Sequence, residues 1–233
     1  SWAEYYQDNL LDPIRMTKET LAKEKIRLGS YGYAGQYNQN PVPEGGGKVK
    51  EAWFVTCKPG EVPGGITWNV WLDGAYTDST ANDPTGLMVA GYHRPTKIVY
   101  VKHATSMHMV LPDLLDFLPE YCKMHGITKK SRIYYEPKAS GHSIGQMMNR
   151  KTNFASVSIR GKLVRDGKEA RLAVASPYIE AAKIIWVEGP YLEEVKAQLC
   201  GFPVHDHDEY VDLTGYLSYK HFRQQTAAAR RRN

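Results

Sequence analysis

Cysteines are scarce in this 233-residue sequence and lie far apart. The three of them, Cys57, Cys122 and Cys200, form no CxxC pair. An odd number of widely spaced cysteines argues against a disulfide framework and against a Cys/His zinc site, and it fits a reducing compartment. We therefore expect free thiols and no structural zinc.

Long apolar runs are also missing. No segment approaches the roughly 18–20 apolar residues that a membrane-spanning helix needs, and no charged-then-apolar leader of the signal-peptide type is visible. Hydrophobic residues make up 42% and charged residues 24% of the chain, as in globular proteins that work in water. We expect no membrane partner.

A phosphate-binding loop is absent as well. The segment 45–48 ends in Gly-Lys, but Val49 follows where the P-loop requires Ser or Thr, and the GxxxxGK spacing is missing. We therefore expect no ATP site of this type. The net charge of +5 mildly favours a polyanionic partner. Three consecutive arginines (230–232) also lie close to the last residue.

The hydrophobic pattern predicts an α/β fold. Five strands are expected at 67–73, 86–93, 97–103, 132–136 and 183–187, because short apolar runs end there at turn residues or acids. Helical spacing predicts helices in 1–36, 109–125, 142–150, 169–182, 191–200 and from 208 to about 225, with a linker at 37–50. The first three strands follow one another closely and should pair antiparallel, whereas helical crossovers after them favour parallel pairing. The prediction is a mixed central sheet flanked by helices.

Four acidic residues stand out by their positions. Asp73 ends the first expected strand, Glu136 ends the fourth, and Asp208 and Asp212 lie four residues apart at the start of the last helix. Catalytic groups of α/β sheets gather outside strand ends, and residues four apart share one helix face. If the first and fourth strands are neighbours, Asp73 and Glu136 lie side by side.

Converging carboxylates repel each other and therefore need protons or a cation. Their hard oxygen ligands suit Mg²⁺ or Mn²⁺, and two such ions about 3.5–4 Å apart can hold the attacking water and the leaving oxygen of a phosphodiester. Each acid read alone has an ordinary structural role, as a turn residue, a surface residue, a helix cap or a partner of the helix dipole. The combination of two strand-end acids with helix acids is what favours a two-metal site.

At these residues the chain resembles the nuclease domain of the large subunit of phage DNA-packaging terminases. The resemblance covers nearly everything from about residue 30 onward. It is carried by the segments GQYNQNPVPEGG, TWNVWLDGAYTDSTANDPTGLMVAG, IYYEPKASGHSIGQMM, KEARLAVASPYIEAAKIIWVEGPYLEEVKAQLCGFP and HDEYVDLTGY. The third motif of that family has adjacent acids and a further Asp three residues on, here Asp208-Glu209 and Asp212. The motif does not fix which of these three residues binds metal, but we expect Asp208 and Asp212 to be catalytic metal ligands together with Asp73 and Glu136.

The resemblance implies an RNase H-like fold and metal-dependent cutting of double-stranded viral DNA, in the cytoplasm of an infected host cell. It implies residues 51–225 as the nuclease, residues 1–50 as a helical and linker segment leading to an ATPase domain outside this sequence, and 226–233 as a basic tail. Expected partners are DNA, that ATPase domain, a small terminase subunit and a portal, with the isolated domain monomeric. Asp78 and Glu209 are expected to support the metal ligands.

Basic residues near the acids are candidates for binding DNA phosphates. Asp166-Gly167 predicts a hairpin turn, and the expected hairpin carries Arg160, Lys162, Arg165, Lys168 and Arg171. Lys138, two residues after Glu136, is a further candidate. A solvated, charge-rich hairpin explains the pattern equally well.

Two other functions fit the same pattern. One is a resolvase or strand transferase, which would use the same carboxylates on the same fold. The other is a module that docks on DNA or on a portal without cutting, in which case the acids would only cap helices and face solvent.

Overall fold

The computed structural model describes residues 12–37, 48–74, 84–136, 141–159 and 167–223. Its strands are β1 (Val55–Cys57), β2 (Trp68–Asp73), β3 (Thr85–His93), β4 (Ile98–Met107), β5 (Arg132–Tyr135), β6 (Ala155–Ser158) and β7 (Ile184–Val187). Its helices are α1 (Lys18–Gln36), α2 (Leu111–Met124), α3 (Gly141–Thr152), α5 (Lys168–Glu180), α6 (Leu192–Gly201) and α7 (Glu209–Ser218), with the short helical turns η2 (Glu51–Trp53), η3 (Pro59–Glu61) and η4 (Tyr219–Arg223).

The strands form one mixed sheet in the order β1-β7-β4-β3-β2-β5-β6. The pairs β2–β3 and β3–β4 are antiparallel, and β5 lies parallel to β2. The remaining pairs, β5–β6, β4–β7 and β1–β7, are also parallel. The expected α/β fold is confirmed, including the neighbouring positions of the first and fourth predicted strands.

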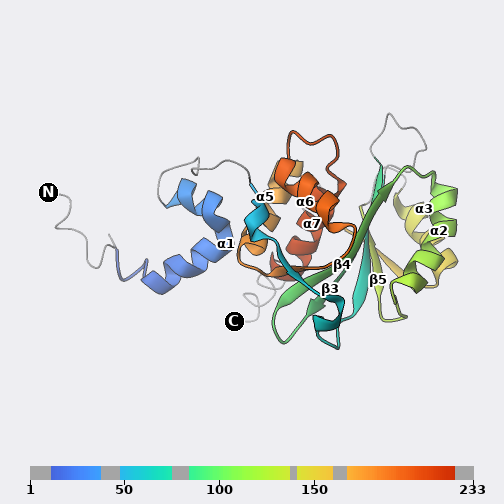
Figure 1. Cartoon of the computed structure of the whole chain (residues 1–233), viewed down its shortest axis with the longest axis horizontal. Helices are drawn as coiled ribbons and strands as arrows, with labels where there is room; N and C mark the ends of the chain where they lie inside the picture. The colour runs from blue at the N-terminus through green and yellow to red at the C-terminus, as the bar shows by residue number, and fades with distance from the viewer. Residues whose placement is uncertain (1–11, 38–47, 75–83, 137–140, 160–166, 224–233) are drawn as a thin grey trace.

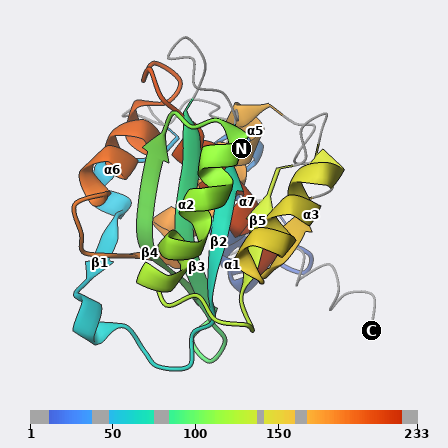
Figure 2. The ribbon, with the colours of Figure 1, turned by 90° about the vertical axis from the view of Figure 1, so that its right-hand side faces the viewer.

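Helices cover both faces of this sheet (Figure 1). On one face α2 and α3 pack on the side chains of Val70, Leu72 and Leu87, and Figure 2 shows α2 lying across the strands there. On the other face α5, α6 and α7 pack on Trp71, Met88 and Trp186. Successive residues of a strand point to opposite faces, so both cores draw on β2 and β3. The carboxylate of Asp73 follows Trp71 by two residues and belongs to the α7 face.

The structure corrects three sequence predictions. The strand β1 was missed, because it is three residues long and two of these are exposed, which leaves no hydrophobic pattern to detect. The strand β6 was missed as well, and it lies parallel to β5 at the edge of the sheet. The predicted second arm of the hairpin is wrong, because Lys168 and Arg171 belong to the first turn of α5. The part of that hairpin at 160–166 lies outside the described residues.

The N-terminal helix α1 lies against α5 (Figure 1). Gly29 interrupts it with a φ of 66°, and a Cβ there would lie 3.1 Å from the Cα of Pro177. Val49, just before the predicted start of the nuclease, is buried in the core around α5. Within the described residues, no helix is both long enough and apolar enough to cross a bilayer.

The helices α5 and α7 lie in close contact at Gly215. A Cβ on Gly215 would lie 2.8 Å from the Cβ of Arg171 and 3.0 Å from its backbone oxygen. Real Cβ atoms do not come this close, so any larger residue would push the two helices apart.

We therefore expect Gly215→Ala to destabilise the protein by about 1–3 kcal/mol, because overpacking outweighs the gain in helix propensity. The measurement is urea unfolding. As a control, Gly60→Ala adds a methyl group where no atom lies within 4 Å, so its effect should stay within about 0.5 kcal/mol. Equal effects of the two substitutions would contradict this account of the α5–α7 contact.

Candidate metal centre

The pairing of β2 with β5 places Asp73 beside Glu136. Trp71 lies opposite Tyr134 and Leu72 opposite Tyr135, so the next pair in this register is Asp73 and Glu136. The backbone N–H of Glu136 donates to the carbonyl oxygen of Leu72 at 3.3 Å, which extends the pairing past the end of the strand. Because both acids lie two residues beyond side chains of the α7 face, both carboxylates point toward α7.

The helix α7 contributes the third carboxylate, from Asp212 in its first turn. Asp73, Glu136 and Asp212 each offer one oxygen atom, and these three atoms lie within 4.8 Å of one another. Asp212 is 2% exposed and Asp73 8%. The sequence prediction that acids from two strands and the last helix converge is therefore met by the geometry of these three residues.

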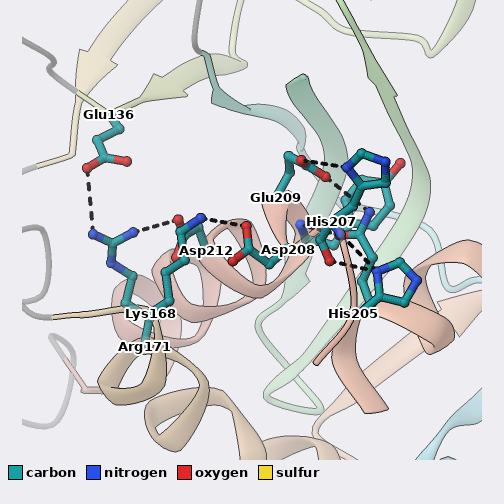
Figure 3. A network of polar contacts seen from close by, with 10 residues as sticks. Glu136, Lys168, Arg171, His205, His207, Asp208, Glu209 and Asp212 are labelled. Atoms are coloured by element: carbon teal, nitrogen blue, oxygen red, sulfur yellow. Dashed lines mark hydrogen bonds and ion pairs between the residues drawn. The ribbon is translucent and has the colours of Figure 1, made fainter. Parts of the chain in front are cut away.

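Arg171 of α5 lies among these carboxylates (Figure 3). Its Nη1 is 2.6 Å from Oδ2 of Asp212, and its Nη2 is 3.8 Å from Oε1 of Glu136. The guanidinium also lies over the ring of Tyr216, 5.1 Å from the ring centroid. Burial disfavours its charge, yet Asp212, Tyr216 and Glu136 together raise the pKa of Arg171. The sequence gives no signal for this arrangement, because α5 and α7 meet only in the folded chain.

Arg171 does not offset the effect of burial on the carboxylate that it contacts most closely. Burial, followed by the nearby Asp73 carboxylate, raises the pKa of Asp212 to about 7 although Arg171 acts against it. The Oδ1 atom of Asp212 is buried and accepts no hydrogen bond from any described residue. A divalent cation would fit this set of donors, because it adds positive charge and coordinates oxygen atoms.

The two other acids of the third motif lie outside this group of three. Asp208 precedes α7, and its Oδ1 is 2.5 Å from Nζ of Lys168. Glu209 is 2% exposed and accepts a hydrogen bond from Nε2 of Gln198 at 3.1 Å. Burial raises the pKa of Glu209. Within the described chain, Asp212 is therefore the acid of that motif that joins Asp73 and Glu136.

Several predicted site residues lie outside the described part of the chain. These are Asp78, Lys138, Arg160, Lys162 and Arg165. Lys168 and Arg171 are described, and both contact carboxylates of the third motif, as Figure 3 shows. In this structure both side chains thus pair with acids of the third motif, a contact that the sequence pattern did not indicate.

The sheet order and the acidic cluster define an RNase H-like α/β fold. Among solved structures, the chain has the fold of the nuclease domains of large terminases. The large terminase nuclease of thermophilic phage G20c with bound magnesium has a TM-score of 0.54 and 10% identity, over 76% of this chain and 99% of that one. The manganese-soaked, inhibitor-bound terminase nuclease domain of human cytomegalovirus gives 0.51 and 10%, over 76% and 97%.

A longer protein also matches. The large terminase of another thermophilic bacteriophage, in complex with ADP, has a TM-score of 0.58 and 13% identity, over 89% of this chain and 53% of that one. No protein-family model and no curated protein sequence matches the chain. The structural matches thus confirm the fold that the motifs predicted. Their sequence identities, 10–13%, are too low to show more than the fold.

The raised pKa of Asp212 predicts a specific pH dependence of stability in metal-free protein. Its folded pKa of about 7 lies above the ordinary value of about 3.9 for an unfolded chain. The buried neutral form therefore stabilises the fold at low pH, and this contribution is lost as the pH rises from about 4 to about 7. The quantity to compare is the free energy of unfolding of the wild type minus that of Asp212→Asn. As the pH rises, this difference should fall by at most about 1.4 kcal/mol per pH unit and then level off.

Urea unfolding in EDTA between pH 5 and pH 8 measures this difference. Subtracting the variant removes the contributions of the other titrating groups that both proteins share. A difference that stays constant, or that grows with pH, would show that Asp212 is charged throughout and that the cluster already contains enough positive charge.

Proposed function

We propose that this chain is a metal-dependent endonuclease that cleaves double-stranded viral DNA during genome packaging. The observation that carries the proposal is the convergence of Asp73, Glu136 and Asp212 at one end of the sheet, with a buried Asp212 oxygen that accepts no hydrogen bond from a described residue. Nuclease domains of large terminases share the fold, and one of those structures holds magnesium.

Asp73, Glu136 and Asp212 would hold the metal. The proposal includes two Mg²⁺ or Mn²⁺ ions, because pairs of such ions serve phosphodiester hydrolysis in many nucleases. When bound, the ions supply a water of lowered pKa and positive charge facing the phosphate. A DNA phosphate would otherwise be repelled by three carboxylates, so metal binding and substrate binding should depend on each other.

The remaining residues orient the ligands. Arg171 contacts both Glu136 and Asp212, and therefore limits how far these two carboxylates can move apart. Asp208 would support the ligands through its contact with Lys168. Glu209 would do so through the buried hydrogen bond that it accepts from Gln198. Positioned ligands of this kind avoid the cost of rearranging the site when substrate binds. Two roles stay predictions. One is that of Asp78 as a further supporting acid, and the other is that of phosphate contacts for Lys138, Arg160, Lys162 and Arg165.

The packaging context is part of the proposal. The match to the ADP-bound large terminase covers 53% of that phage protein, which agrees with a nuclease half that works with an ATPase domain of the same protein. A small terminase subunit, a portal and double-stranded DNA would be the other partners, in the cytoplasm of an infected cell. Residues 51–225 would form the nuclease, and we propose that it is monomeric in isolation.

The first experiment incubates the purified chain with supercoiled plasmid and Mn²⁺, with and without EDTA. We expect nicking and linearisation that EDTA abolishes and that Asp73→Ala lowers by at least about a hundredfold, since a metal ligand is lost. Asp113→Ala is the matched control, because Asp113 is an exposed acid of α2 and its loss should leave cutting unchanged.

Three results would speak against the proposal. Undiminished cutting by Asp73→Ala would remove Asp73 from the site. A strong preference for four-way junctions over linear duplex would favour a resolvase. DNA binding without cutting, together with no Mn²⁺ uptake by calorimetry, would favour a docking module.

A second experiment separates the acids of the third motif. Because Asp212 lies in the cluster and Asp208 pairs with Lys168, we expect Asp212→Asn to abolish Mn²⁺ uptake and cutting. Asp208→Asn should lower the cutting rate by no more than about tenfold to a hundredfold, as for a residue that supports ligands. Calorimetry and plasmid cutting measure the two effects. The reverse order would make Asp208 the ligand.

A further inference from the structure

A cavity of about 820 Å³ opens at the other end of the sheet, away from the carboxylates. It lies between the beginnings of β2 and β5, the turn from β3 to β4, and η4. Four basic side chains line it, namely those of Arg94, Lys130, Arg132 and Lys220. The described residues around it include no aspartate and no glutamate.

The positive charge of this cavity is not neutralised by the described protein. None of its four basic side chains forms an ion pair with a residue that the structure describes. Arg94, Lys130 and Arg132 are exposed, and Lys220 is half-buried. One of its two histidines, His221, adds no charge at neutral pH, because burial, and then Lys220, lower its pKa to about 4. The cavity therefore presents a permanent positive potential to an anion.

Aromatic contacts hold part of this charge in place. The Nζ of Lys220 lies 5.3 Å from the ring centroid of Tyr134, and that ring stacks on Trp71 at 4.4 Å. The guanidinium of Arg132 donates from Nη1 to the carbonyl oxygen of Ser131 at 3.1 Å. These rings are engaged by protein side chains, so the cavity is suited to phosphate groups more than to stacked bases.

Three rows of residues connect the cavity to the carboxylates along the same face of the sheet. On β5 the row runs from Arg132 through Tyr134 to Glu136. On β2 the row runs from Asn69 through Trp71 to Asp73, and from η4 into α7 it runs from Lys220 through Tyr216 to Asp212. A smaller hollow lies between the ends and is lined by the middle residues of all three rows, Tyr134, Trp71 and Tyr216.

The length of these rows sets the distance between the cavity and the carboxylates. Four residues of a strand span about 13 Å, and eight residues of a helix span about 12 Å. Along duplex DNA one strand carries a phosphate about every 3.4 Å of helix axis. Because the strand also winds around that axis, the direct distance between its phosphates grows faster than the axial rise, so the two ends of the rows are separated by about two nucleotides of one strand.

We propose that this cavity binds the phosphodiester backbone of a DNA strand about two nucleotides from the bond held at the carboxylates. The position of the cut relative to the cavity rests on the proposed nuclease function. The binding itself rests on the charge and shape of the cavity. Arg94, Lys130, Arg132 and Lys220 would contact phosphates and set where the strand lies, without reading base sequence.

The test measures binding apart from cutting. All proteins carry Asp73→Asn and bind a short linear duplex in EDTA at several salt concentrations. The variant is Lys130→Gln with Arg132→Gln. Its control, Lys25→Gln with Lys58→Gln, removes the same charge from exposed residues outside the cavity. Loss of two phosphate contacts should lower the salt slope by about 2 and the affinity by at least about tenfold at about 0.1 M salt, with a much smaller change in the control.

A second measurement locates the contact. Duplexes carry one uncharged methylphosphonate at successive positions from the cut site, which cleavage by the wild type identifies. Neutralising the phosphate about two nucleotides away should weaken binding by the Asp73→Asn protein. It should have little further effect once Lys130 and Arg132 are replaced.

The outcomes separate this inference from the proposed function. Equal salt slopes and affinities for the variant and its control, or no DNA binding by any of the proteins, would overturn the cavity as a backbone site. If the variant binds weakly while the wild type cuts nothing with any metal, the binding site stands and the nuclease proposal fails.

Discussion

The parallel pairing of β5 with β2 is the constraint on which the candidate site depends. It aligns Trp71 with Tyr134 and thereby Asp73 with Glu136, two acids that are 63 positions apart in the sequence. Since strand residues alternate between faces, the same register sends both carboxylates toward α7. A shift by one residue would send one of them into the apolar layer under α2 and α3. The chemistry of the site thus follows from a backbone hydrogen-bond pattern.

The helix α7 completes the site because it can lie close to both the sheet and α5. A Cβ on Gly86 of β3 would lie 2.8 Å from the Cβ of Glu209, and one on Gly215 would lie equally close to Arg171. These contacts bring Asp212 to the strand ends and Arg171 to Asp212. Converging, largely buried carboxylates need protons or cations, so the packing of α7 creates the arrangement for which we propose metal binding.

Charge is divided between the two ends of the same sheet face. The carboxylates at one end are buried or half-buried and repel phosphate, whereas the cavity at the other end carries arginine and lysine side chains that form no ion pair with a described residue. Net charge alone, at +5, does not show this separation. The predicted basic hairpin placed DNA contacts at 160–171, but its described part, Lys168 and Arg171, neutralises acids. Four basic side chains instead line the cavity where β2 and β5 begin.

The sequence by itself determined much of this protein. Its hydrophobic periodicity located five of the seven strands in the described part of the chain and the helices that flank them, because strands and helices of ordinary length leave a local pattern. Acids at strand ends likewise marked Asp73 and Glu136. The tertiary structure alone decided that Asp212 rather than Asp208 joins them, that Arg171 lies between carboxylates, and that Arg94, Arg132 and Lys220 share one cavity. These arrangements depend on contacts between residues far apart in the chain, for which local sequence patterns contain no information.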